Sequence, residues 1–135
     1  MAKNQEKEIC GVEMPPISDF LNETQRDGTE LCADKVFRET YSWLQSNNCE
    51  NAVGKQLVEQ YAMSVSRWIH CEQQISKYGY IAKHPTTGAA MASPYVSMAQ
   101  TYMKQVIALR NEINQLIANY RPPFADYPQE VVYGE

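Results

Sequence analysis

Two long amphipathic segments dominate this chain, and the connection between them cannot be a tight helical turn. The segments cover about residues 50–78 and 93–121, and each would form a helix roughly 40 Å long at 1.5 Å per residue. Matched lengths favour an antiparallel helical hairpin. The connection, residues 79–93, contains the stretch KHPTTGAAMASPY and exceeds the roughly two to eight residues usual in helix bundles. Connections of that length tend to be functional or mobile.

Local signals predict where each helix begins and ends. The first helix starts between Thr29 and Asp34, either of which is a suitable N-cap, and reaches about Gln45. In the second helix, Gly79 is a left-handed residue after the last turn. In the third, Ser93 is the N-cap, Pro94 occupies the first position, and the sequence RPP stops the helix at Arg121.

Apolar residues recur at helical spacing in all three segments, which predicts three buried faces. In the first two helices the faces are Val36, Phe37, Thr40, Tyr41 and Leu44, and then Leu57, Tyr61, Val65, Trp68 and Ile75. The third helix carries a main stripe of Val96, Ala99, Met103, Val106, Ile113, Ile117 and Tyr120.

The third helix also carries a second stripe beside the first, formed by Met98, Tyr102, Leu109 and Leu116. A second stripe exposed on a monomer would be a natural contact with another subunit, so these four residues are expected at an oligomer interface. The alternative is that both stripes fold into one three-helix core, and the sequence leaves the choice open.

The long connection has the pattern of a small hairpin. YGYIAKH suits an extended strand, PTTG suits a turn, and AAMAS suits a return strand. Such a hairpin would project from the helix pair. Its backbone N–H groups and hydroxyls suit phosphates, which makes Lys77, Lys83 and His84, with Lys104 further along, candidate DNA-binding residues. Alternatively, its small residues would pack tightly against a neighbouring subunit.

Charge is distributed unevenly along the chain. The net charge of −4 divides into −5 for residues 1–34, +4 for residues 35–110 and −3 for residues 111–135. Overall acidity argues against a general coat for nucleic acid but allows a local basic patch. We therefore expect an irregular acidic segment at 1–28, a helical domain for oligomerisation and DNA recognition at 29–121, and a Pro-rich flexible tail at 122–135.

No catalytic or cofactor motif is legible. The four cysteines form no C-x-x-C pair, and no histidine cluster completes a metal site. VGKQL lacks the flanking residues of a phosphate-binding loop. The first residues have no apolar core of a signal peptide, and no segment is apolar enough to span a membrane. We expect no enzyme activity, no cofactor and no metal, with reduced thiols in a cytosol.

Three stretches together resemble the small subunit of tailed-phage terminases: FRETYSWLQSNN, LVEQYAMSVSRWIHCEQQISKYG and KHPTTGAAMASPYVSMAQTYMKQVIALRNEI. The resemblance covers about residues 33–119. It implies a non-enzymatic protein in the cytoplasm of a bacterial host that assembles into a ring and recognises double-stranded phage DNA. It also implies regulation of the large subunit, which carries the ATPase and nuclease activities.

The resemblance suggests a partner for the tail and leaves two other classes of protein open. The apolar tail residues Phe124, Tyr127, Val131 and Tyr133 would bind the large subunit. The expected fold is all-α, with one shorter helix, a long antiparallel helical hairpin and an extended or β-hairpin-like connector, assembling into a ring. The alternatives are a small helical DNA-binding transcriptional regulator and a structural helical interaction module without nucleic acid.

Overall fold

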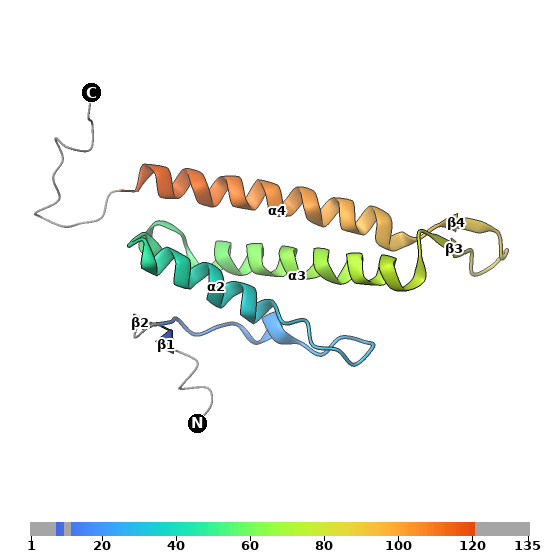
Figure 1. Ribbon diagram of the computed structural model, residues 1–135, viewed down its shortest axis with the longest axis horizontal. Helices are drawn as coiled ribbons and strands as arrows, with labels where there is room; N and C mark the ends of the chain where they lie inside the picture. Colours follow the sequence, from blue (N-terminus) through green and yellow to red (C-terminus); the bar gives the residue numbers. More distant parts are fainter. Residues whose placement is uncertain (1–7, 10–11, 121–135) are drawn as a thin grey trace, which may run out of the picture.

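Three helices make up most of the computed structural model, which describes residues 8–9 and 12–120 and the side chains of residues 14–120. Helices α3 (Lys55–Tyr78) and α4 (Pro94–Asn119) form an antiparallel hairpin, and α2 (Ala33–Ser46) packs on α3 (Figure 1). The predicted shorter helix and long helical hairpin are confirmed. The ring concerns several copies, so it stays a prediction.

Helix α2 starts within the predicted range, at Ala33, but its N-cap differs from the prediction. Its N-cap is Cys32, in a left-handed conformation with φ of 61°, and neither Thr29 nor Asp34 caps it. Thr29 instead belongs to a turn in which its N–H and hydroxyl both donate to Asp27 Oδ1, at 3.0 and 2.7 Å. The Cys32 N–H donates to Asn22 Oδ1 at 3.0 Å, so a residue ten positions earlier fixes the helix entry.

The second helix begins later than expected, whereas its end is confirmed. A short 3₁₀ turn, η2 (Glu50–Ala52), precedes Gly54, which is the N-cap of α3. Gly79 ends α3 with φ of +83°, and its N–H donates to the Ile75 carbonyl at 2.7 Å. Its ψ of −179° is extended rather than left-handed helical, so the chain leaves straight into the connector.

Helix α4 begins as its sequence predicts. Pro94 occupies the first turn, and the Ser93 hydroxyl accepts a hydrogen bond from the Tyr95 N–H at 3.3 Å. This bond satisfies a backbone donor that the helix cannot pair internally. The last helical residue is Asn119, and Tyr120 is the C-cap, so the helix ends two residues before the predicted Arg121.

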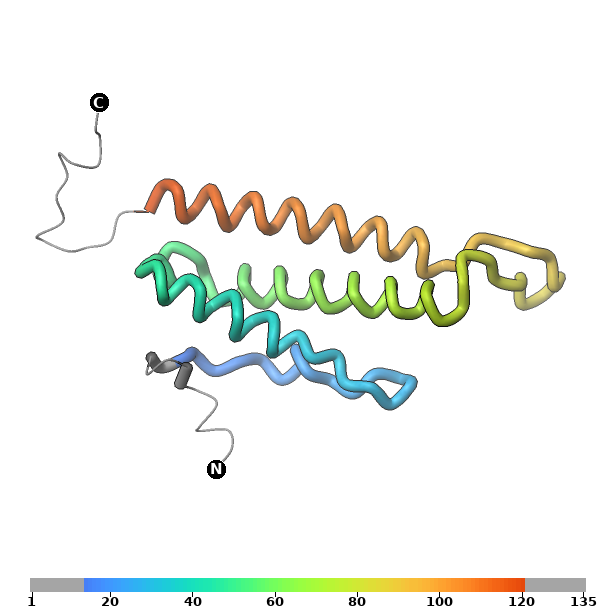
Figure 2. Tube along the Cα trace, viewed as in Figure 1, coloured from blue at the N-terminus to red at the C-terminus, as the bar shows by residue number. Residues whose placement is uncertain are grey.

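The connector is a β-hairpin that extends past the ends of α3 and α4 (Figure 2). Strands β3 (Ile81–Lys83) and β4 (Ala90–Ala92) pair antiparallel, with Ile81 opposite Ala92 and Lys83 opposite Ala90. The predicted hairpin is therefore confirmed, and the fold is mostly helical with small antiparallel strand pairs rather than strictly all-α. A second pair joins β1 (Glu8–Ile9) to β2 (Val12–Glu13).

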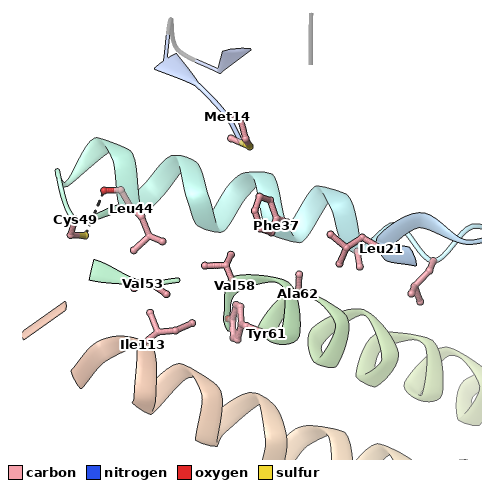
Figure 3. Packing of buried hydrophobic residues seen from close by; sticks show 12 residues of the cluster. Met14, Leu21, Phe37, Leu44, Cys49, Val53, Val58, Tyr61, Ala62 and Ile113 are labelled. Atoms are coloured by element: carbon pink, nitrogen blue, oxygen red, sulfur yellow. Dashed lines mark hydrogen bonds between the residues drawn. The ribbon is translucent and has the colours of Figure 1, made fainter. Parts of the chain in front are cut away.

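The hydrophobic core lies where α2, α3 and α4 meet. Figure 3 shows Val58 and Tyr61 of α3 between Leu44 of α2 and Ile113 of α4. The N-terminal segment contributes as well, although only a short 3₁₀ helix, η1 (Asp19–Asn22), gives it regular structure. Its buried residues in this core are Met14, Leu21 and Leu31.

A buried carboxylate attaches this N-terminal segment to the helical body. Glu59 of α3 is almost fully buried and accepts a hydrogen bond from the Ser18 N–H at 3.1 Å. Lys55 Nζ lies 3.8 Å from the same carboxylate. A second link joins Arg67 Nη1 to Gln25 Oε1 at 2.6 Å. The irregular segment is thus packed on the domain, a feature that its sequence did not reveal.

Candidate nucleic-acid and subunit interfaces

The hairpin end of the molecule exposes aromatic and basic side chains together. Tyr78, Tyr80 and Ile81 are more than half exposed, with Tyr80 at 71%. Lys77 Nζ lies 5.2 Å from the centre of the Tyr78 ring, a distance at which a cation interacts with an aromatic face. Lys83 is exposed on β3. This end therefore offers both π faces and positive charge to a partner.

No acidic residue occurs between positions 73 and 111, a range that holds Lys77, Lys83, Lys104 and Arg110. The hairpin and most of α4 thus form an acid-free region on a chain that is acidic overall. Three of the four predicted DNA-binding residues, Lys77, Lys83 and His84, lie at the hairpin end. Lys104 is exposed on α4, ten residues or roughly 15 Å along the helix from Pro94, and so lies apart from them.

The backbone at the hairpin tip is already hydrogen-bonded within itself. The N–H groups of Thr86 and Thr87 donate to His84 Nδ1 at 3.2 and 3.3 Å. The Gly88 N–H donates to the His84 carbonyl at 2.9 Å, and the His84 N–H donates to the Ala89 carbonyl at 2.8 Å. The Ala89 N–H donates to Thr87 Oγ1 at 3.3 Å.

These bonds overturn one premise of the sequence analysis, because the tip has no free backbone N–H groups between His84 and Ala89 to offer a phosphate. The donors that remain are side chains. Since His84 Nδ1 accepts two bonds, a neutral imidazole carries its proton on Nε2, which is then the ring donor. Any contact between the tip and a phosphate would use this group, the threonine hydroxyls or the Lys83 ammonium.

The second apolar stripe of α4 follows one edge of the helical hairpin; we call Met98, Tyr102, Leu109 and Leu116 the Tyr102 edge. Met98 and Leu116 are exposed, whereas Tyr102 and Leu109 are half-buried against α3. A hollow runs beside this edge between α3 and α4. Its lining is Gln60, Met63, Ser64, Arg67, Tyr102, Gln105, Ala108 and Leu109.

An opposite edge carries a second set of exposed apolar side chains, Trp43, Met103 and Ile107, which we call the Trp43 edge. Trp43 is 54% exposed and Ile107 is 55% exposed. Trp43 lines a groove between α2 and α4, together with Tyr61 and Arg110. Arg110 Nη2 donates to the Tyr61 hydroxyl at 2.6 Å, and its guanidinium also lies over the Tyr61 ring.

A family model for the phage terminase small subunit matches residues 33–114, which is more than half of the chain. The chain belongs to the phage terminase small subunit family. The match begins at the first residue of α2 and ends five residues before the end of α4, so it includes the Trp43 edge, the β-hairpin and all of the Tyr102 edge except Leu116. No curated protein and no solved structure matches the chain significantly.

Membership of the terminase small subunit family supports a role in DNA packaging. Proteins of this family are generally non-catalytic. Among the described residues, no group of three His, Cys, Asp or Glu side chains could hold a metal ion. In that part of the chain, no helix is long and apolar enough to cross a membrane. The predicted tail residues Phe124, Tyr127, Val131 and Tyr133 lie outside the described residues.

Sequence reasoning missed the Trp43 edge of this terminase subunit. Met103 was assigned to the core stripe, yet it is exposed, and neither Trp43 nor Ile107 fell on any predicted stripe. One signal was available: Met103 and Ile107 are four residues apart and so share a side of their helix. Trp43 joins them only through the packing of α2 on α3, which helical periodicity does not predict.

Proposed function

We propose that this protein is the small subunit of a phage packaging terminase that recognises double-stranded viral DNA and regulates the large ATPase and nuclease subunit. The family match over α2, α3, the β-hairpin and most of α4 carries this proposal. The protein would act in the cytoplasm of the bacterial host, where the genome is packaged.

Self-assembly into a ring is the second part of the proposal. Apolar side chains that remain exposed on two edges of a small domain support contacts between copies. Repeating a weakly binding element several times on one assembly raises its overall affinity for a long ligand. The absolute mass of the protein in solution tests this part, and a monomer at micromolar concentration would remove it.

We propose that DNA binds at the hairpin end through Lys77, Lys83 and His84, and that Lys104 makes a separate contact. The support is the acid-free stretch from 73 to 111 and the projection of the hairpin beyond the helices. Lysines that contact phosphates contribute sequence-independent affinity that weakens with salt. Exposed tyrosines beside them add π faces, although Tyr78 and Tyr80 would serve equally in a contact between subunits.

The double variant Lys77→Ala/Lys83→Ala tests the DNA surface. It should weaken binding to all duplex sequences, and the slope of log affinity against log salt should become shallower by about 0.9 for each phosphate that is no longer neutralised by a lysine. The matched control is Arg26→Ala/Lys35→Ala, which removes the same charge from exposed positions on the N-terminal segment and α2. If both variants bind DNA equally weakly, net charge alone explains the effect and the hairpin is not the DNA surface.

The contact with the large subunit is proposed for residues 122–135, with Phe124, Tyr127, Val131 and Tyr133 as the apolar side chains. A short apolar and acidic segment at the end of a domain suits docking on a partner. Deleting residues 122–135 should abolish binding to the large subunit and leave the oligomer mass unchanged. Unchanged binding after the deletion would place the contact elsewhere on the protein.

A further inference from the structure

The two faces of the β-hairpin differ in exposure. Residues directly opposite each other in an antiparallel strand pair project to the same side of the sheet. The central pair, Ala82 opposite Met91, is half-buried. The pairs on either side of it project the other way and are exposed, and we call this set the ribbon face: Ile81, Lys83, Ala90 and Ala92. Because the hairpin extends past α3 and α4 (Figure 2), the helices leave this face open to a partner.

The ribbon face combines one cation with apolar side chains. Lys83 is its only polar side chain, and the residue opposite it is Ala90, which is too small to obstruct the ammonium group. Ile81 is 65% exposed and is the only large apolar group of the face. A phosphate would pair with the lysine but would offer nothing to the apolar groups. The best partner for this face therefore carries hydrogen-bond acceptors and apolar groups side by side.

The major groove of duplex DNA offers this combination. Guanine presents the acceptors N7 and O6 there, and thymine presents its C5-methyl group beside the acceptor O4. Lysine is one of the side chains that contact guanine in this groove, and small apolar groups contact the thymine methyl. The minor groove presents acceptors without a methyl group. The chemistry of the ribbon face therefore favours the major groove.

The size of the hairpin favours the same groove. Neighbouring strands lie about 4.8 Å apart, and a two-stranded ribbon enters the major groove, which is about 12 Å wide, but not the minor groove, which is about 6 Å wide. Each strand has three residues and spans roughly 10 Å, the length of about three base pairs. The charge of the region is complementary to DNA, because no acidic residue occurs between positions 73 and 111.

We infer that the ribbon face lies in the major groove and contacts base edges, with Lys83 donating to guanine and the apolar side chains contacting thymine methyl groups. Lys77, in the last turn of α3, stays outside the groove and neutralises a phosphate. The inference rests on the DNA binding in the proposed function and goes beyond it by assigning the groove, the face of the hairpin and the bases that are contacted.

Modified bases in a single duplex distinguish the two grooves. The probe is the duplex that the wild-type protein binds most tightly after selection from random sequences. Replacing guanine by 7-deazaguanine removes the N7 acceptor from the major groove, and replacing thymine by uracil removes the methyl group. Replacing guanine by hypoxanthine instead removes the N2 amino group from the minor groove. Affinity should fall roughly fivefold or more for each of the first two duplexes and less than about twofold for the third.

Lys83→Ala and Lys77→Ala are the matched variants. Each removes one positive charge from an exposed side chain, so both should weaken binding to the unmodified duplex. Only Lys83→Ala should bind the 7-deazaguanine duplex as well as the unmodified one, because Lys83 is the group that contacts guanine. Lys77→Ala should keep the full loss of affinity for the modified duplex.

Ile81→Ser tests the apolar part of the ribbon face. The preference for thymine over uracil should decrease, and the oligomer mass from light scattering should stay the same. A lower oligomer mass with wild-type DNA affinity would place the ribbon face against another copy of the chain and would overturn the inference.

The modified duplexes also separate this inference from the proposed function. Equal affinity for all of them, or a larger loss with hypoxanthine than with 7-deazaguanine, rejects the major-groove contact and leaves DNA binding standing. The same holds if the protein binds duplex DNA but selection enriches no sequence, or if Lys83→Ala remains sensitive to 7-deazaguanine. A wild-type protein that binds no duplex rejects both the groove contact and the proposed DNA recognition.

Discussion

The two ends of the helical hairpin place their apolar side chains differently. Where α2 crosses α3, Phe37, Leu44 and Val58 are fully buried. At the other end, the last turn of α3 and the strand that follows leave Tyr78, Tyr80 and Ile81 mostly in solvent. Burial of large apolar groups is the main source of folding free energy. The packed end therefore determines the fold, and the hairpin end has its apolar and basic groups available for partners.

The largest loss of stability in this comparison of the two ends should come from Phe37→Ala. The ring is completely buried and stacks on Tyr41 at 5.7 Å between centroids, so its removal leaves a cavity and should cost about 3–5 kcal/mol of unfolding free energy. Urea unfolding followed by circular dichroism measures the change. Tyr80→Ala removes another aromatic ring, exposed on the hairpin, and should change stability by less than about 0.5 kcal/mol.

Equal destabilisation by these two substitutions would contradict the comparison. It would mean that Tyr80 is covered in the folded protein, for example by another copy. Repeating the measurement at low and high protein concentration separates the two cases, because stabilisation by a subunit contact depends on concentration.

A smaller effect is expected where the N-terminal segment joins the packed end. Glu59→Ala removes the acceptor for the Ser18 N–H and should cost about 1–3 kcal/mol, because this partly buried donor loses its partner. Hydrogen exchange should quicken at Ser18 and in η1 more than in α4. Glu59→Gln, which keeps an acceptor oxygen, is the matched variant and should be less destabilised. Equal exchange in α4 and η1 would mean that the segment is not a separable layer.

Local chemistry explains which helix boundaries were predictable. The start of α4 follows from Ser93 and Pro94 alone, because both act within one turn. The start of α2 depends on Asn22 accepting from the Cys32 N–H across ten residues, and no pattern near the helix encodes that contact. The β-hairpin was predictable for the same reason as α4, since strand, turn and return strand are adjacent in sequence.

The surfaces were less predictable than the elements that form them. The Tyr102 edge was found because its residues repeat along one helix. The Trp43 edge combines α2 with α4 and appears only once both helices have packed on α3. At the hairpin tip, the composition suggested free backbone donors, yet His84 accepts two of them. Whether a donor is free depends on the folded geometry, which composition does not determine.

Cys71 tests how far the packed interior extends toward the hairpin. It is 1% exposed, only seven residues before the exposed Tyr78, and burial raises the pKa of its thiol above the ordinary value of 9.0. The folded state therefore keeps this proton at a pH where the unfolded chain loses it. The stability that this provides is complete below pH 9 and should decline as the pH rises above it.

Thiol labelling at pH 8 provides the measurement. With the other three cysteines replaced by serine, Cys71 should react many-fold more slowly than Cys32 in the corresponding single-cysteine variant, because Cys32 is partly exposed. Similar rates for the two thiols would mean that the last turns of α3 open readily and that packing ends before Cys71.

The smallest effect on stability should follow from replacing the hairpin tip. Lys83 and Ala90 are opposite each other in the strand pair, so residues 84–89 can be exchanged for Asn-Gly, a two-residue turn that suits antiparallel strands. The exchange leaves the core, the two edges and Lys83 in place. The unfolding free energy should change by less than about 0.5 kcal/mol, and the oligomer mass should stay the same.

If the tip contacts nucleic acid through His84 and the threonine hydroxyls, duplex affinity should fall while the salt slope set by Lys77 and Lys83 persists. Wild-type affinity in this variant, together with weaker binding by Lys77→Ala/Lys83→Ala, would confine the DNA contact to the base of the hairpin.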